Sequence, residues 1–287
     1  MSLRLHIAQL EPTLGNLEEN LSRHLDALEA ARREGSSLLL FPELSLTGYF
    51  LKDQTSEVAL ELDSPPLRAL LEQSHDLTIG VGFIERGEDG RLYNAYALLE
   101  DGEVLHVHRK VHLVTYGMFE EGRDLAAGER FQVARSKHGR IGLMICEDAW
   151  HASTAWLYHL AGVELLVVPS AGPARGVQAG QEGFGSVQTW RTLLTHAAGL
   201  HQCFVAYANR VGCEDGVTFA GASRVIDPFG RELAALEGLE PGQLSAELDL
   251  AECERARLQT PLRRDEKPWL VQRELERLGL EESGEDA

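Results

Sequence analysis

One stretch of the sequence, Arg140 to Trp150, places a thiol at the end of an apolar segment. It reads RIGLMICEDAW, in which the run from Ile141 to Ile145 is followed at once by Cys146 and two acidic residues. A run of this length and composition is typical of a buried β-strand. Ser153 then offers an N-cap for a helix. The stretch therefore predicts a strand, a tight turn that carries Cys146, and a helix.

Cys146 has two interpretations on this pattern. A turn between a strand and a helix exposes a side chain at the carboxyl edge of a sheet, where backbone N–H groups lower the pKa of a thiol and form an oxyanion site. Cys146 would then be a nucleophile; a buried structural cysteine is the alternative, because free cysteine is among the most buried residue types. Cys203, Cys213 and Cys253 show no CxxC spacing, and four cysteines are too few for a disulfide scaffold, so we expect all four to be reduced.

Two charged residues fall at or near the ends of other expected strands. Glu43 follows a short apolar run and a proline, and Lys110 shares one face of an expected strand with His106, His108 and His112. For Glu43 the alternative is a solvated loop acid, since acidic residues are mostly exposed. Three histidines on one face could indicate a metal site, but Lys110 among them would repel a divalent cation. We therefore expect no metal here.

Strand and helix patterns alternate through both halves of the chain, which favours a layered α/β fold. The 287 residues contain enough apolar material for one large domain, which we expect to span residues 1–265. Residues 266–287 are expected to form a helix on Leu270, Leu275 and Leu278, followed by an acidic tail. We expect strands at residues 3–10, 37–41, 76–85, 92–100, 103–112, 131–133, 141–145, 164–169 and 203–209, two more strands within 218–236, and helices at 17–31, 65–73, 153–160 and 186–199.

The charge balance argues against several classes of partner. The 45 acidic and 27 basic residues give a net charge of -18, whereas nucleic acid and anionic membrane surfaces attract basic patches. No apolar run approaches the ~18 residues that a membrane span needs, and the first residues lack a signal-peptide pattern. The glycine-rich segment 171–185 has neither GxGxxG nor a Walker A ending. We expect a cytoplasmic protein whose partners are small molecules.

A thiol, a carboxylate and an ammonium at three strand ends are expected to converge at one edge of this fold. Cys146 would attack an electrophilic carbon, Glu43 would take the thiol proton and later activate water, and Lys110 would stabilise the oxyanion. The segments FPELSLTGY, HRKVHL and MICEDAW around these residues resemble the three catalytic motifs of the nitrilase superfamily of carbon–nitrogen hydrolases. The segment YANRVGCEDGVTFAGASRVIDPFGR is similar to that family as well, so the resemblance covers about residues 3 to 250.

The resemblance implies a fold, an intermediate and a further acid. The fold is an α-β-β-α four-layer sandwich of two mixed β-sheets, and the implied chemistry uses a covalent thioester with no metal or organic cofactor. Many members carry a second glutamate eight residues beyond the lysine, where this chain has Met118. The segment KVHLVTYGMFEEGR is instead similar to the glutaminase domain of glutamine-dependent NAD synthetases, whose acid lies eleven residues on, at Glu121. Gly172 replaces a substrate-binding serine of that branch, which argues against glutamine itself.

We expect an amidase that cleaves a small linear carboxamide to a carboxylic acid and ammonia. A nitrilase acting on a small nitrile is the nearest alternative, and a non-catalytic protein that kept the fold is another. A cysteine peptidase would need a histidine bonded to the thiol, and His151 lies across the turn. Tyr49, Tyr116 and Glu147 are expected to wall the pocket because they stand beside the three motifs, and Arg175 could hold a substrate carboxylate.

The family's assembly through helices leads us to expect a homodimer. The expected helices at 153–160 and 186–199 carry large apolar side chains, and aromatic residues are favoured at interfaces. The alternative for these side chains is an ordinary place in the core. The candidate interface residues are Trp156, Leu157, Trp190, Leu193 and Leu194.

Overall fold

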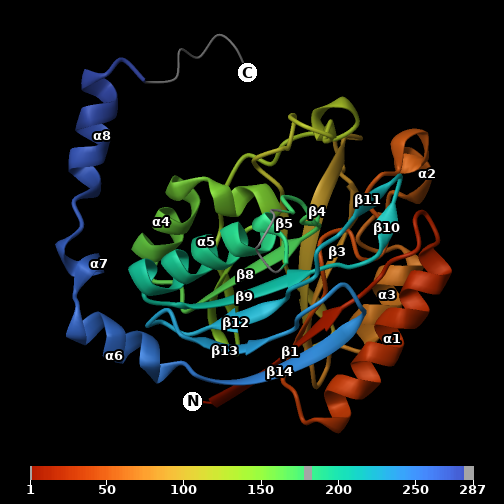
Figure 1. The fold of residues 1–287 in the computed structure, drawn as a ribbon, viewed down its shortest axis with the longest axis horizontal. Helices are drawn as coiled ribbons and strands as arrows, with labels where there is room; N and C mark the ends of the chain where they lie inside the picture. Colours follow the sequence, from red (N-terminus) through yellow and green to blue (C-terminus); the bar gives the residue numbers. More distant parts are fainter. Residues whose placement is uncertain (1, 178–182, 281–287) are drawn as a thin grey trace.

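The computed structural model describes residues 2–177 and 183–280 and is built on two six-stranded β-sheets (Figure 1). The first sheet has the order β14-β1-β2-β3-β4-β5 and the second the order β13-β12-β9-β8-β7-β6. In each sheet three parallel strands, β1 to β3 or β7 to β9, are flanked by antiparallel neighbours, so both sheets are mixed. The strands are β1 (Ser2–Gln9), β2 (Leu38–Leu40), β3 (Thr78–Arg86), β4 (Leu92–Glu100), β5 (Glu103–Arg109), β6 (Ala134–Ser136), β7 (Gly139–Leu143), β8 (Leu165–Ser170), β9 (Phe204–Asn209), β12 (Arg224–Ile226), β13 (Glu232–Ala235) and β14 (Gly242–Asp249).

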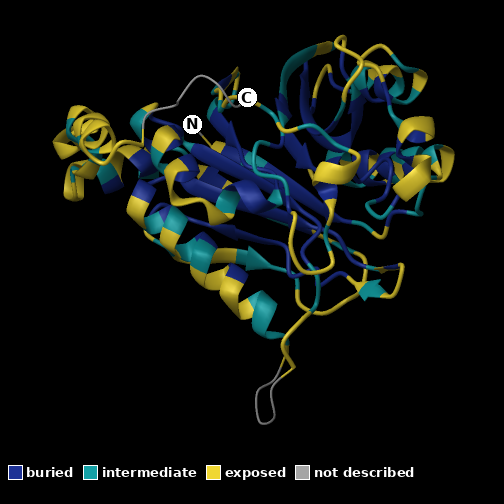
Figure 2. Ribbon diagram, turned by 90° about the horizontal axis from the view of Figure 1, so that it is seen from above, coloured by how far each residue is buried: buried dark blue, intermediate teal, exposed yellow. Residues whose placement is uncertain are grey.

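The two sheets pack against each other, and helices cover their outer faces. Leu5, Leu40 and Leu98 of the first sheet share a fully buried cluster with Leu143 and Val167 of the second. A second cluster lies between the first sheet and helices α1 (Leu17–Arg33) and α3 (Pro65–Glu72), and a third between the second sheet and helices α4 (Ala152–Leu160) and α5 (Gly185–His201). Figure 2 shows both sheets as buried and the outer helix faces as exposed. The predicted α-β-β-α sandwich is therefore confirmed.

Local sequence explains where α1 begins and why the turn after β2 can form. The side chain of Asn16 accepts a hydrogen bond from the backbone N–H of Glu19 at 3.1 Å, as expected for the N-cap of α1. Gly82 in β3 faces the turn that follows β2, and a Cβ there would lie only 2.5 Å from the backbone nitrogen of Leu44. Glycine at this position lets the backbone from Pro42 to Leu44 lie directly on the sheet.

Three predicted boundaries are wrong. Strand β5 ends at Arg109 instead of continuing to His112, because the backbone N–H groups of Val111 and His112 donate to the buried carboxylate of Asp148. The strand expected at 131–133 is found at β6, which begins only at Ala134. The helix expected to be capped at Ser153 starts at Ala152 with His151 as N-cap, since a 3₁₀-helix, η3 (Cys146–Trp150), fills the turn.

Several elements after residue 209 have no counterpart among the predicted strands and helices. Strand β14 pairs with β1 along eight residues, from Ser2 opposite Asp249 to Gln9 opposite Gly242. A small hairpin of β10 (Cys213–Glu214) and β11 (Val217–Thr218) stands apart from both sheets, and α6 (Ala251–Gln259) follows β14. The remaining short helices are η1 (Lys52–Gln54), α2 (Thr55–Val58), η2 (Glu121–Arg123) and α7 (Leu262–Asp265).

The C-terminal helix α8 (Pro268–Arg277) lies where the sequence placed it and projects from the body of the fold (Figure 1). The expected acidic tail, residues 281–287, and residues 178–182 of the glycine-rich segment lie outside the described residues. In the part of the chain that the structure describes, no helix is long and apolar enough to cross a membrane.

Two of the expected interface residues belong to the core. Trp190 is 5% exposed and packs against the ring of Tyr207 at 4.9 Å, and Leu194 is 1% exposed in the same cluster. Both face the second sheet, so the prediction that they lie at a dimer interface is wrong. Leu157 is exposed, while Trp156 and Leu193 are half-buried. The homodimer itself stays a prediction.

Candidate active site

Glu43 and Cys146 occupy sharp turns after strands of different sheets. Glu43 lies in the turn after β2 with its side chain fully buried, and the next residue, Leu44, has a positive φ of 50°. Cys146 begins η3 shortly after β7 and itself has a φ of 46°. A positive φ is uncommon for residues other than glycine and persists only where the surrounding structure enforces it. Both turns are therefore held in conformations that aim their side chains.

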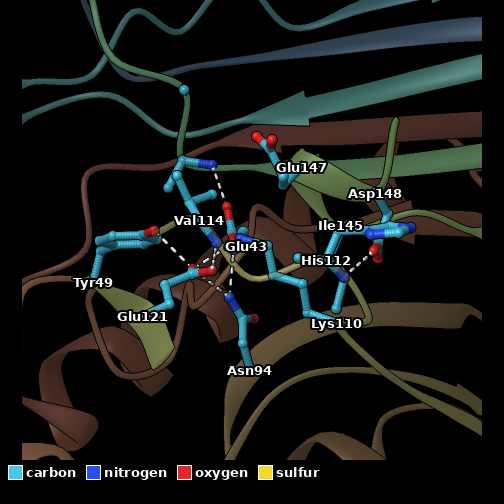
Figure 3. A network of polar contacts seen from close by, with 12 residues as sticks. Glu43, Tyr49, Asn94, Lys110, His112, Val114, Glu121, Ile145, Glu147 and Asp148 are labelled. Atoms are coloured by element: carbon cyan, nitrogen blue, oxygen red, sulfur yellow. Dashed lines mark hydrogen bonds and ion pairs between the residues drawn. The ribbon is translucent and has the colours of Figure 1, made fainter. Parts of the chain in front are cut away.

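Lys110 joins Glu43 to Glu121 at the centre of the site (Figure 3). Its Nζ donates to Glu43 Oε1 and to Glu121 Oε1, each at 2.8 Å, and the side chains of Lys110 and Glu43 are 0% exposed. Glu120 is exposed at the molecular surface, and Met118, eight residues beyond the lysine, is 40% exposed. The structure thus brings Glu121 against Lys110 and leaves Glu120 outside.

Neighbouring groups donate further hydrogen bonds to both oxygens of each carboxylate. Asn94 in β4 donates through Nδ2 to Glu43 Oε1 at 2.7 Å, and the backbone N–H of Ala171 donates to Glu43 Oε2 at 2.7 Å. Tyr49 donates its hydroxyl to Glu121 Oε1 at 2.7 Å, and the backbone N–H of Val114 donates to Glu121 Oε2 at 2.8 Å. Each carboxylate is thereby fixed in one orientation.

Neither Asn94 nor Ala171 was among the site residues predicted from the sequence. A signal for Asn94 exists, because it is a lone amide in the otherwise apolar strand LYNAYALLE. Ala171 acts through its backbone N–H, so its residue type carries no signal.

The electrostatics of the site keep the thiol protonated at rest. Burial raises the pKa of Cys146, and the Glu43 carboxylate raises it further, while Lys110 and a hydrogen bond from the backbone of Ala171 act in the opposite direction. Burial also raises the pKa of Glu43, against the attraction of Lys110. Burial alone would lower the pKa of Lys110, but the carboxylates of Glu121 and Glu43 overcome it and hold that pKa well above its usual range. The resting site therefore holds a thiol, an ammonium and a carboxylate close to it that can take the thiol proton.

Cys146 differs from the other three cysteines in its surroundings. It is half-buried and packs against both the inter-sheet cluster and the cluster beneath α4 and α5. Cys203 and Cys253 are buried, and burial raises the pKa of Cys253 to about 11. Cys213 is exposed in the β10 hairpin. All four are free thiols, as expected.

Tyr116 and Glu147 pair beside the turn that carries Cys146. The hydroxyl of Tyr116 lies 2.9 and 3.0 Å from the two carboxylate oxygens of Glu147, and burial together with this carboxylate raises the pKa of Tyr116 to about 12. Tyr116 is 59% exposed, whereas Glu147 is 9% exposed. Arg175 is exposed and its guanidinium lies 5.8 Å from the centre of the Phe119 ring, over the loop that carries Tyr116. The carboxylate of Glu147 and the guanidinium of Arg175 thus lie against the same loop.

The three histidines expected on one strand face lie in different surroundings. His106 is half-buried, and its Nε2 has no hydrogen-bond partner. His108 is buried, with Nε2 2.9 Å from Asp148 Oδ2. His112 lies beyond the end of β5 and stacks on His151 with 3.6 Å between ring centres. Within residues 2–177 and 183–280, no three His, Cys, Asp or Glu side chains are placed to hold one metal ion.

Residues 4–258 match the family of carbon–nitrogen hydrolases. The chain belongs to this family. Its members are hydrolases that act on carbon–nitrogen bonds, and the motifs around Glu43, Lys110 and Cys146 all lie within the matched region. The predicted family resemblance is confirmed.

Several relatives within this family are similar over most of the chain. A glutamine-dependent NAD(+) synthetase from Thermotoga maritima is 36% identical over 267 residues, which are 91% of this chain and 45% of that protein. An (R)-stereoselective amidase from a Pseudomonas species is 31% identical over 258 residues, covering 89% of this chain and 88% of the amidase. The chain therefore spans less than half of the synthetase and nearly the full length of the amidase.

A solved structure extends the similarity to a covalent complex. It is a variant of the amidase from Nesterenkonia sp. AN1, in which the acetamide moiety of fluoroacetamide is covalently attached to the active-site cysteine. The two folds agree with a TM-score of 0.78 at 27% sequence identity, and the match covers 94% of this chain and 96% of the amidase.

Proposed function

We propose that the protein hydrolyses a small linear carboxamide to a carboxylic acid and ammonia through a thioester on Cys146. The observation that carries this proposal is the buried cluster in which Lys110 Nζ lies 2.8 Å from both Glu43 and Glu121, with the thiol of Cys146 in its field. A base, a cation and a thiol in one water-poor site supply what nucleophilic acyl transfer needs.

The proposed reaction proceeds in two halves. Glu43 takes the thiol proton as Cys146 attacks the amide carbon, and the ammonium of Lys110 stabilises the oxygen of the tetrahedral intermediate. Glu43 then returns the proton to the leaving nitrogen, so that ammonia departs and the thioester forms. Water enters, Glu43 removes one of its protons, and attack on the thioester releases the acid and regenerates the thiol. Glu121 keeps Lys110 charged and in place.

The amidase assignment is supported by relatives of similar length. The (R)-stereoselective amidase and the Nesterenkonia amidase match nearly the whole of both chains. A nitrile would also be attacked by Cys146, and the resulting thioimidate would have to lose ammonia after water adds. Glu43 and Lys110 could serve that route too, which keeps a nitrilase as the second candidate.

Ammonia release from matched amides and nitriles tests the proposal. We expect kcat/KM to be higher for acetamide, propionamide and butyramide than for acetonitrile, propionitrile and butyronitrile. Faster release from a nitrile than from its amide would identify a nitrilase. No release from either series, in a protein whose Cys146 reacts with iodoacetamide, would favour a non-catalytic member of the family.

The pairing of Tyr116 with Glu147 supports an amine-bearing or neutral amide rather than an anionic one. A nearly buried carboxylate beside the nucleophile would attract a substrate ammonium and repel a dianion. Arg175, over the same loop, could instead hold a substrate carboxylate. Tyr49, which reaches Glu121, would complete the wall of the pocket.

Paired variants distinguish these substrate classes. Glu147→Gln is expected to raise KM at least about 10-fold for an amide that carries an amino group, because one charge-assisted hydrogen bond is lost. The same variant should leave KM for acetamide within about twofold. Arg175→Ala serves as the control and should change neither value. A loss confined to carboxylate-bearing amides in Arg175→Ala would show that the substrate is anionic.

The site of action and the assembly remain proposals. We propose a cytoplasmic homodimer that binds neither nucleic acid nor membranes, in accord with the net charge of -18. Leu157 on α4 is 44% exposed and would be one apolar contact with a partner copy.

A further inference from the structure

The side chain of Asp148 lies between the two catalytic segments and contacts both. Its Oδ1 accepts hydrogen bonds from the backbone N–H groups of Val111 at 3.1 Å and His112 at 2.9 Å, which directly follow Lys110. Its Oδ2 accepts a hydrogen bond at 3.0 Å from the backbone N–H of Ile145, the residue before Cys146. Figure 3 shows Asp148 beside Ile145 and His112. One carboxylate therefore connects the chain at Lys110 to the chain at Cys146.

His108 completes the set of partners. It lies two residues before Lys110, and its Nε2 is 2.9 Å from Asp148 Oδ2. Both side chains are almost completely buried, at 1% and 0% exposure. The His108 ring also packs against Phe131 with 5.7 Å between ring centres, which limits its movement. A buried carboxylate is costly unless its oxygens are paired, and here three backbone N–H groups and one imidazole pair with it.

We propose that Asp148, oriented by His108, is a positioning residue that sets the location of Lys110 relative to the Cys146 thiol. The inference rests on the proposed roles of Lys110 and Cys146. Sheet pairing ends just before these donors: the backbone N–H of Lys110 still donates to the carbonyl of Asn94 at 2.8 Å, and that of Met144 to the carbonyl of Val167 at 3.0 Å. The next N–H groups, of Val111, His112 and Ile145, donate to Asp148 instead. The carboxylate replaces the missing ladder hydrogen bonds and ties the two strand ends together.

The reaction is sensitive to this distance. Lys110 must reach the oxygen of the intermediate while Cys146 reaches its carbon, and a displacement of about 1 Å can cost about 100-fold in rate. Loss of the hydrogen bonds from Asp148 to the segments at Lys110 and Cys146 should therefore lower kcat much more than it raises KM. The residues proposed to contact the substrate, Tyr116 and Arg175, make no hydrogen bond to Asp148 among those of the described residues.

Asp148→Asn tests the tether with a readout that separates positioning from charge. The asparagine side chain has one acceptor oxygen instead of two, so it cannot accept hydrogen bonds from all three backbone N–H groups and the imidazole. Lys110 and Cys146 should then move apart, and kcat should fall about 100-fold. The thiol would then lose part of the stabilisation that Lys110 gives its thiolate, and the midpoint of the pH profile for alkylation by iodoacetamide should rise. If Asp148 acted only as a nearby negative charge, removing it would favour the thiolate. A lower midpoint in Asp148→Asn would therefore overturn the proposal.

Variants at His108 keep the proposal falsifiable if Asp148→Asn does not fold. His108→Leu removes the donor and should lower kcat about 10- to 100-fold, the usual cost of losing a group that orients another. His108→Gln offers an amide N–H to Asp148 in its place and should restore kcat to within about threefold of the wild-type value. The matched control is His106→Leu on the same strand, whose Nε2 has no hydrogen-bond partner, and it should leave kcat within about twofold.

The outcomes separate this inference from the proposed function. Equal kcat values for His108→Leu, His108→Gln and the wild type, in folded proteins, would overturn the positioning role while leaving amide hydrolysis intact. If the wild type hydrolyses no amide or nitrile, the proposed function fails, but the alkylation profiles still decide whether Asp148 governs the thiol. A raised midpoint in Asp148→Asn would support the tether in that case too.

Discussion

Cys146→Ala is expected to reduce amide turnover to background and to leave a folded protein. Removing the nucleophile of a covalent mechanism costs roughly 10⁶-fold in turnover. The thiol is half-buried at a turn, and the backbone there already has a positive φ that alanine must also adopt, so the strain is unchanged. We expect the free energy of unfolding to change by no more than about 1 kcal/mol. Ammonia release and thermal unfolding measure the two effects.

The control for this variant is Cys213→Ala. Cys213 is the exposed thiol in the β10 hairpin, and its loss should leave kcat within about twofold of the wild-type value. Turnover by Cys146→Ala above the background of the buffer would rule out Cys146 as the nucleophile. Equal losses in both variants would point to a general effect of thiol removal instead.

Glu121→Gln is expected to lower kcat by at least about 100-fold, the low end for losing one electrostatic or proton-transfer group. Glu121 accepts hydrogen bonds from Lys110 and Tyr49 on one oxygen and from the backbone of Val114 on the other. A glutamine places an N–H₂ group against one of these donors, because all the partners donate. Lys110 also loses a carboxylate that holds its pKa high, and burial then disfavours the ammonium.

Glu120→Gln is the matched control, since it makes the same chemical change one residue earlier in the chain. Glu120 is exposed and makes no ion pair with Lys110. Its variant should keep kcat within about twofold of the wild type. Steady-state kinetics of the two proteins on the same amide decide the assignment, and a large loss in Glu120→Gln with none in Glu121→Gln would reverse it.

Two of the proposed catalytic residues, Glu43 and Cys146, could be placed from the sequence because each stands just after an apolar run. Glu43 and Cys146 follow buried strands directly, and the chain must turn where such a run stops. Glu121 carried no such pattern, since it lies in a loop beside an identical residue, and only the resemblance to a family singled it out. In the sequence, Asp148 is only one of two acids after the cysteine. Its structural role depends on the backbone N–H groups that donate to it, which the sequence does not reveal.

The elements that sequence patterns missed depend on partners far away in the chain. Strand β14 alternates buried and exposed residues, yet its place is set by pairing with β1 more than 230 residues earlier. Trp190 is a large aromatic residue of the kind favoured at interfaces, but its ring packs against Tyr207 on β9 of the same chain. The end of β5 was misplaced because Asp148, 36 residues after His112, captures the N–H groups that would have continued the ladder. Pairing over such distances leaves no local signal.

Peptide mapping of the protein quenched in acid during turnover tests the central claim most directly. With propionamide as substrate, we expect a propionyl group on the peptide that contains Cys146 and none on the peptide that contains the exposed Cys213. The adduct should be lost on treatment with hydroxylamine, as a thioester is. A protein that releases ammonia from propionamide while Cys146 stays unmodified at every quench time, or that carries the group on Cys213, would contradict the account.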